Sequence, residues 1–88
     1  MILLITYDLK GPVGTYAPLF QAIQNEGPWS HFIASTWLVT TRRTPQEVGT
    51  MLVPLIKQGD FLLVTQFGSQ YWGWLPKAAW DWIAQQPK

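Results

Sequence analysis

Short apolar stretches typical of strands alternate with two stretches of helical spacing, and this alternation constrains the fold more than any other feature of the chain. Residues 2–8, ILLITYD, form a short apolar run that predicts a buried strand. From Thr15 to about Glu26, apolar residues recur with the spacing of one helical face, and Gly27-Pro28 ends this helix. The residues of that face are Tyr16, Leu19, Phe20 and Ile23.

The middle of the chain repeats the alternation. Residues 29–41 are rich in β-branched and aromatic residues but too long for one strand, so the small residues Ala34 and Ser35 predict a bend between two strands. The sequence TPQE, residues 44–47, is typical of a capping box that starts a helix. Pro54 predicts that this helix is kinked or shortened. Its apolar stripe comprises Val48, Leu52, Leu55 and Ile56.

The remaining residues complete the predicted fold. Residues 60–67, DFLLVTQF, predict another strand, an aromatic turn GSQYWGW follows, and a helix is expected from about Pro76 to Gln85. The order βαββαβ plus a terminal helix indicates an α+β protein with a ferredoxin-like antiparallel sheet, two helices on one face, and a single domain over residues 1–88. We expect the C-terminal segment or a second subunit to cover the other face.

Composition narrows the classes of protein that the chain can represent. Apolar residues make up 48% of 88 residues and charged residues 12%, with six tryptophans, so a homodimer interface is expected to bury part of the apolar surface. The net charge of +1 argues against a broad electrostatic grip on nucleic acid. No cysteine is present for a disulfide or a zinc site. Without a signal peptide or a long apolar run, we expect a cytoplasmic protein with no membrane contact.

Three stretches connect the chain to a known group of proteins. They are ITYDL, where an acid closes the first strand; GPWSHFIASTWLV, with its Trp, its His and the following STW; and GDFLLVTQF, where an acid precedes the last strand. With these stretches in this order, nearly the whole chain resembles the SinR-like proteins. That group lies in the superfamily that joins the VapD toxins to the CRISPR-associated endoribonuclease Cas-two.

The resemblance implies a ferredoxin-like homodimer and a metal-dependent endonuclease. In nuclease members of the superfamily, the acid after the first strand lies near the twofold axis, where both copies hold one divalent metal that activates water against a phosphodiester. Asp8 stands in that position here. The implied activity is hydrolysis of RNA or DNA with Mg²⁺, including the variant of a toxin-like ribonuclease. The alternative is a non-catalytic dimeric scaffold that binds protein or nucleic acid, which low charge and many aromatic residues favour.

Asp8 is the candidate catalytic residue and metal ligand. Mg²⁺ binds through one or two carboxylates and keeps several waters, so one acid per chain suffices only if symmetry brings two copies together. The structural alternative is that Asp8 caps the following turn through a hydrogen bond to the Gly-rich loop.

Four residues are candidate phosphate ligands. Lys10 lies in a loop with Gly11 and Gly14 that could approach a phosphate, or that simply forms a turn. Ser35 has a hydroxyl at the predicted bend, where it could instead satisfy backbone groups. Arg42 and Arg43 precede the capped helix, so their guanidinium groups and the free N–H groups could converge on an anion, or lie at a solvated strand end.

The aromatic residues and the one histidine have structural and functional interpretations. His31 is expected to be structural, because no spacing indicates a nucleophile elbow around it. The tryptophans could stack on bases, but without interleaved basic residues they are expected in the core or in a dimer contact. The predicted dimer-interface residues are Tyr71, Trp72 and Trp74.

Overall fold

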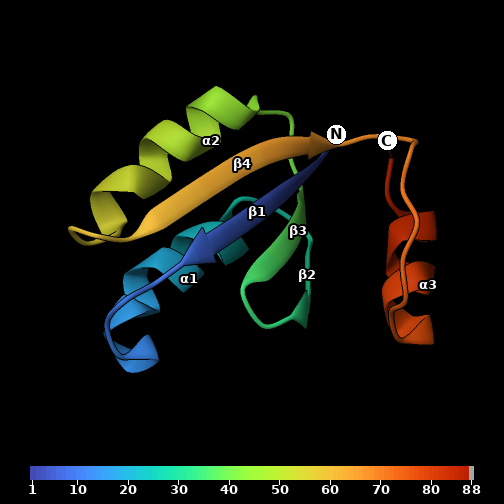
Figure 1. Cartoon of the computed structure of the whole chain (residues 1–88). Helices are drawn as coiled ribbons and strands as arrows, with labels where there is room; N and C mark the ends of the chain where they lie inside the picture. The colour runs from blue at the N-terminus through green and yellow to red at the C-terminus, as the bar shows by residue number, and fades with distance from the viewer. Residues whose placement is uncertain (88) are drawn as a thin grey trace.

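Four strands form one antiparallel sheet in the computed structural model, which describes residues 1–87. The strands are β1 (Ile2–Asp8), β2 (Trp29–Ile33), β3 (Thr36–Thr40) and β4 (Phe61–Phe67), in the spatial order β2-β3-β1-β4 (Figure 1). The long strands β1 and β4 pair along their whole length, from Ile2 opposite Phe67 to Asp8 opposite Phe61. The α+β class and the antiparallel sheet predicted from the sequence are therefore confirmed.

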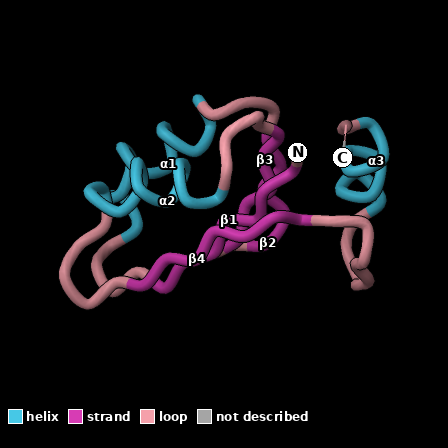
Figure 2. The backbone as a smooth tube through the Cα atoms, turned by 90° about the horizontal axis from the view of Figure 1, so that it is seen from above, coloured by secondary structure: helices cyan, strands magenta, loops and turns pink. Residues whose placement is uncertain are grey.

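The helices connect these strands and divide into two groups in space. A short 3-10 helix η1 (Val13–Tyr16) leads into α1 (Ala17–Asn25), α2 (Pro45–Leu52) continues as the 3-10 helix η2 (Val53–Leu55), and α3 (Lys77–Gln85) follows β4. Figure 2 shows α1 and α2 together on one face of the sheet, with α3 set apart from them. No helix within residues 1–87 is long and apolar enough to span a lipid bilayer.

The main hydrophobic core lies between the sheet and the pair α1 and α2. Successive side chains of a strand point to opposite faces, so alternate residues of β1 and β3 enter this core. Part of each predicted apolar stripe lies in α1 or α2, and Phe20 is half-buried beside the core. Tyr16 and Leu55 lie instead in the adjoining 3-10 turns, and Ile56 follows η2. The fully buried members of the core are Leu3, Ile5, Tyr16, Leu19, Ile23, Trp37, Val39, Val48 and Leu52.

Local signals in the sequence set several boundaries correctly. The capping box forms as predicted, since the Thr44 hydroxyl accepts from the Glu47 backbone and the Glu47 carboxylate accepts from the Thr44 backbone. Pro54 shortens the helix: α2 ends at Leu52 and the chain continues as one 3-10 turn. The first predicted helix begins as a 3-10 turn, because Tyr16 provides no side-chain cap and Pro18 lies in the first turn of α1.

The face of the sheet opposite α1 and α2 is called the open face below. It carries Leu4, Leu38, Leu63 and Phe61, and α3 covers only part of it. Where α3 packs, Ile2, Ala79 and Ile83 are buried, and the Thr40 hydroxyl donates to the Gln86 side chain at 2.8 Å. Toward the other end of β4, Phe61 and Leu63 remain 68% and 60% exposed. The C-terminal segment therefore covers this face incompletely.

Gly27, between α1 and β2, is predicted to be intolerant of a side chain. A Cβ atom there would overlap the backbone carbonyl oxygen of Thr40, which the sheet fixes in place. We expect Gly27→Ala to lower the free energy of unfolding by about 1–3 kcal/mol in chemical denaturation. The control is Gly14→Ala, where no atom lies within 4 Å of the added methyl. Equal stability of the two variants would contradict the packing described here.

Candidate functional site

Asp8 ends β1 on the open face. It lies directly opposite Phe61 across the β1–β4 pair, and opposed residues of neighbouring strands point to the same side of a sheet. The carboxylate accepts a hydrogen bond from the Lys10 ammonium at 2.7 Å, and both side chains are more than half exposed. This ion pair raises the pKa of Lys10, first through the hydrogen bond and then through the charge of Asp8. Solvent screens such a pair, so it contributes little to stability.

Asp60, rather than Asp8, holds the backbone of the loop that follows β1. Its Oδ1 atom accepts from the Lys10 backbone N–H at 2.8 Å, and its Oδ2 atom accepts from the Lys57 backbone N–H at 2.8 Å. The same Oδ2 accepts from the Tyr16 hydroxyl at 2.7 Å. One carboxylate thus ties together the loop after β1, the start of α1 and the turn before β4.

The partners of Asp60 keep it ionised. Burial acts to raise the pKa of this carboxyl, but hydrogen bonds from Lys10, Tyr16 and Lys57 and the charge of Lys57 outweigh it, so the pKa lies below its usual value. Burial, followed by the bond to Asp60, raises the pKa of the Tyr16 hydroxyl. The Lys57 ammonium lies 4.5 Å from the centre of the Tyr16 ring and donates to the Thr15 hydroxyl. Asp60, Tyr16 and Lys57, called the Asp60 cluster below, therefore contact one another or neighbouring groups of the same chain.

The predicted site residues lie at two ends of the sheet. The Ser35 carbonyl accepts from the Tyr7 backbone at 3.1 Å, so Ser35 lies at the same end as Asp8 and Lys10. Arg42 and Arg43 follow β3, whose last residue, Thr40, pairs with Ile2 at the start of β1. Seven residues of strand separate the two ends, which corresponds to about 20 Å. One chain therefore does not bring Asp8 and the two arginines together.

Arg43 and the start of α2 have structural partners. The Arg43 guanidinium lies 3.5 Å from the carboxylate of Glu26, whose side chain is only 6% exposed, and donates to the Glu47 carbonyl at 3.3 Å. The capping box occupies N–H groups that an anion would need at this helix start. Arg42 is exposed, and no hydrogen bond or ion pair of its side chain is found within residues 1–87.

The aromatic residues on β2 and β3 form a stack. His31 lies parallel to the Trp37 ring with 3.7 Å between ring centres, and its Nε2 atom is 3.0 Å from the Ala34 carbonyl oxygen. The Trp37 indole donates to the Tyr7 hydroxyl at 2.9 Å, and Trp29 packs against the same indole. His31 therefore has the structural environment that the sequence indicates.

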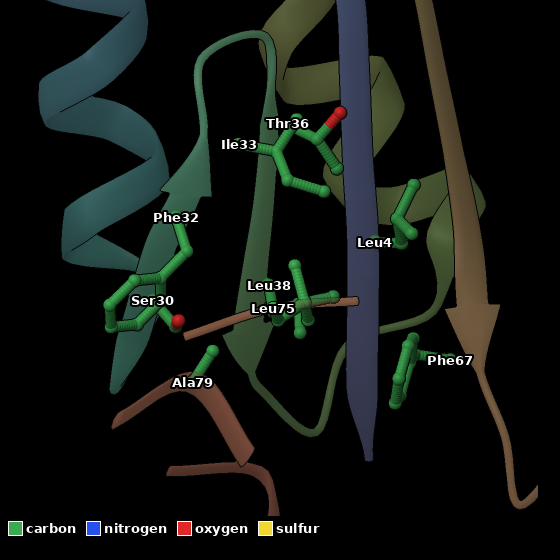
Figure 3. Close-up of a pocket in the computed structure, with 9 residues that line it drawn as sticks. All are labelled: Leu4, Ser30, Phe32, Ile33, Thr36, Leu38, Phe67, Leu75 and Ala79. Carbon is green, nitrogen blue, oxygen red and sulfur yellow. The ribbon is translucent and has the colours of Figure 1, made fainter. Parts of the chain in front are cut away.

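A shallow hollow of about 80 Å³ lies on the open face (Figure 3). Its walls come from β1, β2, β3, the end of β4 and the C-terminal segment. The lining is almost entirely apolar, which suits an apolar partner rather than a charged substrate. The nine residues that line it are Leu4, Ser30, Phe32, Ile33, Thr36, Leu38, Phe67, Leu75 and Ala79.

A second hollow of about 210 Å³ adjoins the first, since both are lined by Ile33, Phe67 and Leu75. The segment after β4 forms its outer wall. Tyr71 packs within the chain, with its ring centre 4.6 Å from that of Phe67 and 6.2 Å from that of Trp80. Trp72 and Trp74 also line this hollow but are 93% and 95% exposed. The exposure of Trp72 and Trp74 leaves their predicted place in a dimer interface open, whereas Tyr71 packs mainly against its own chain.

The part of the chain that the structure describes gathers few acidic or imidazole side chains in one place. Within residues 1–87, no three His, Asp or Glu side chains come together in a way that could hold a metal. Asp8 alone offers one carboxylate, which is already paired with Lys10. Asp8 would be the residue of this chain that holds a Mg²⁺ ion, which takes one or two carboxylates and keeps several waters.

Sequence reasoning did not assign the Asp60 cluster a role. In the sequence, Asp60 is only the acid before the last strand, and Tyr16 is only one residue of an apolar helical face. The available signal is that a carboxylate in a Gly-containing turn typically binds backbone N–H groups. Its partners lie up to 50 residues away in sequence, so local spacing does not reveal them.

In comparisons with known proteins, the chain matches no protein-family model and no curated protein.

Loss of the Asp60 charge is predicted to change how stability depends on pH. A carboxyl whose pKa is lower in the folded state stabilises the fold above the unfolded pKa, about 3.9, and loses that contribution as pH falls through the folded pKa. We expect Asp60→Asn to lower the melting temperature by several degrees at pH 7, with a smaller difference from wild type at pH 2–3. Thermal melts across this pH range measure it.

The control is Asp81→Asn, which removes only an exposed pair with Lys77 one helical turn away. It should leave the melting temperature almost unchanged at both pH values. A constant difference between Asp60→Asn and wild type from pH 7 to pH 2 would contradict the role assigned to Asp60.

Proposed function

We propose that the protein is a non-catalytic homodimeric scaffold with a ferredoxin-like fold, assembled through the open face. The observation that carries the proposal is the exposure of Phe61 and Leu63, at 68% and 60%, on a sheet face that α3 covers only in part. An exposed, contiguous apolar patch on a small domain typically marks an interaction site. A second copy of the chain is the occupant to which we commit.

The amount of apolar surface supports a stable dimer. An aromatic side chain buries about 150–250 Å² when fully covered. By that measure the exposed side chains around the open face offer on the order of 800 Å², which equals the area that each partner buries in a typical stable interface. These side chains are Phe32, Ile33, Phe61, Leu63, Trp72 and Trp74.

The distribution of charge also supports a second copy as partner. In a twofold dimer the same surface meets itself, so a strongly charged face would repel its copy. Along β1 and β4, the open-face positions are apolar or hydroxyl-bearing except for Asp8 at the margin. A net charge of +1 likewise leaves little repulsion between copies.

Two features support the ferredoxin-like assignment and the likeness to SinR-like proteins. The chain order βαββαβ and the placement of α1 and α2 on one face are typical of the split βαβ motif. The stretches that carry the resemblance include Asp8, the acid at the end of β1, and Trp37, the Trp of STW, in β3.

Leu63→Glu is predicted to weaken dimerisation by at least roughly tenfold, since it would place a charge against an apolar partner surface. The dissociation constant can be measured by diluting a fluorescently labelled chain. The matched control is Val53→Glu on the helical side, where Val53 is 55% exposed. Equal dimer affinity of both variants would contradict assembly through the open face.

Metal-dependent phosphodiester hydrolysis is a second candidate function, favoured by one observation. Asp8 lies on the open face beside Phe61, so a dimer assembled through that face could bring two Asp8 carboxylates together. A divalent ion held between them would activate water, and Lys10 and Ser35 lie at the same end to contact phosphate. Arg42 and Arg43 lie at the opposite end and could contribute only from the second copy.

The scaffold proposal predicts that Asp8→Asn changes no nuclease activity. Purified wild type and variant are incubated with labelled RNA and DNA in Mg²⁺ or Mn²⁺, and the cleavage rates are compared. If wild type shows metal-stimulated cleavage and Asp8→Asn lowers its rate at least about a hundredfold, the scaffold proposal is contradicted and the nuclease proposal is supported. Absence of metal-stimulated cleavage in both proteins would exclude the second candidate.

A further inference from the structure

We propose that Trp72 and Trp74 of one copy pack on Phe61 and Leu63 of the second copy, so that the dimer is closed by two identical tryptophan contacts. This inference rests on the proposed homodimer and specifies its geometry. It defines two patches: the tryptophan patch, Trp72 and Trp74, and the β4 patch, Phe61 and Leu63.

The two patches are the most exposed large apolar groups on this side of the molecule. Both tryptophans are more than nine-tenths exposed, and both β4 residues are at least 60% exposed. Indole rings bury a large area at a small entropic cost, which is why tryptophan dominates binding energy at many interfaces. In a monomer, exposure of two such rings to water on one short turn is unfavourable in free energy.

The turn that carries the tryptophans is fixed by contacts on both sides. Before it, Tyr71 packs against Phe67 and Trp80. After it, Leu75 lines the hollow on the open face, and Ala79 and Ile83 of α3 are buried. The tryptophan patch is therefore held ready for a partner, which lowers the entropic cost of association.

The positions of the two patches favour contact between unlike patches. The tryptophan patch adjoins the part of the open face that the C-terminal segment covers. This part lies near Phe67, the last residue of β4, which pairs with Ile2 at the start of β1. The β4 patch lies at the other end of the β1–β4 pair, beside Asp8. In a twofold dimer, if the tryptophan patch of one copy touches the β4 patch of the second copy, symmetry produces the reverse contact as well. Both patches of both copies are then covered at once.

The absence of native cysteine allows a direct test by cross-linking. Gly73→Cys places a thiol between the two tryptophans, where an added Cβ makes only ordinary contact with Trp80. Thr65→Cys places a thiol on an exposed open-face position two residues from Leu63. The two variants, one carrying a mass tag, are mixed, allowed to exchange subunits and treated with a short bifunctional maleimide.

The expected product is a cross-linked pair that contains one copy of each variant, in at least tenfold excess over either like pair. Cross-linking only between like variants, or none in a mixture that sedimentation shows to be dimeric, would overturn the inference while leaving the proposed dimer intact. A mixture that stays monomeric at high concentration would overturn both.

Side-chain replacement gives an independent readout. The double variant Trp72→Ser, Trp74→Ser is expected to weaken dimerisation at least a hundredfold without changing the melting temperature of the monomer at high dilution, since both rings are exposed. Val13→Ser, which removes another exposed apolar side chain on the helical side, is the control. Unchanged dimer affinity in the double variant, together with loss of dimer in Leu63→Glu, would also overturn the inference alone.

Discussion

The structure depends on a simple constraint: a four-stranded sheet has two faces, and α1 and α2 cover only one of them. On the covered face, alternate residues of β1 and β3 meet the apolar stripes of both helices, and the resulting core is fully buried. On the other face, α3 packs against β2 while Phe61 and Leu63 stay exposed. The proposed dimer and its tryptophan contacts follow from this uneven coverage, because exposed apolar surface of this extent favours association.

The Asp60 cluster connects the loop after β1, the start of α1 and the turn before β4. Its carboxylate joins the first two of these segments, which lie 44 to 50 residues away in the sequence, to the third, and these groups surround the end of β1 where Asp8 is exposed. The two acids thus have different tasks. Asp60 binds three groups of its own chain and stabilises the fold, whereas Asp8 is exposed at the end of β1 and pairs with the Lys10 side chain.

Much of the fold could be predicted from the sequence because the signals are local. The strand at residues 2–8, the capping box at Thr44 and the early end of α2 before Pro54 each depend on neighbouring residues. The site was harder to predict, because sequence spacing does not show at which end of a sheet a residue lies. The sequence makes Asp8 a candidate catalytic residue and Arg43 a candidate phosphate ligand, but β3 runs antiparallel to β1 and places Arg43 about 20 Å from Asp8, beside Glu26.

The central claim is that the open face is completed by a second copy of the chain. Its most direct test is the mass in solution, measured by sedimentation velocity from micromolar to near-millimolar protein. Dimerisation through the open face predicts a reversible approach to twice the chain mass of 10.1 kDa. A species that keeps the mass of one chain at the highest concentration would contradict it.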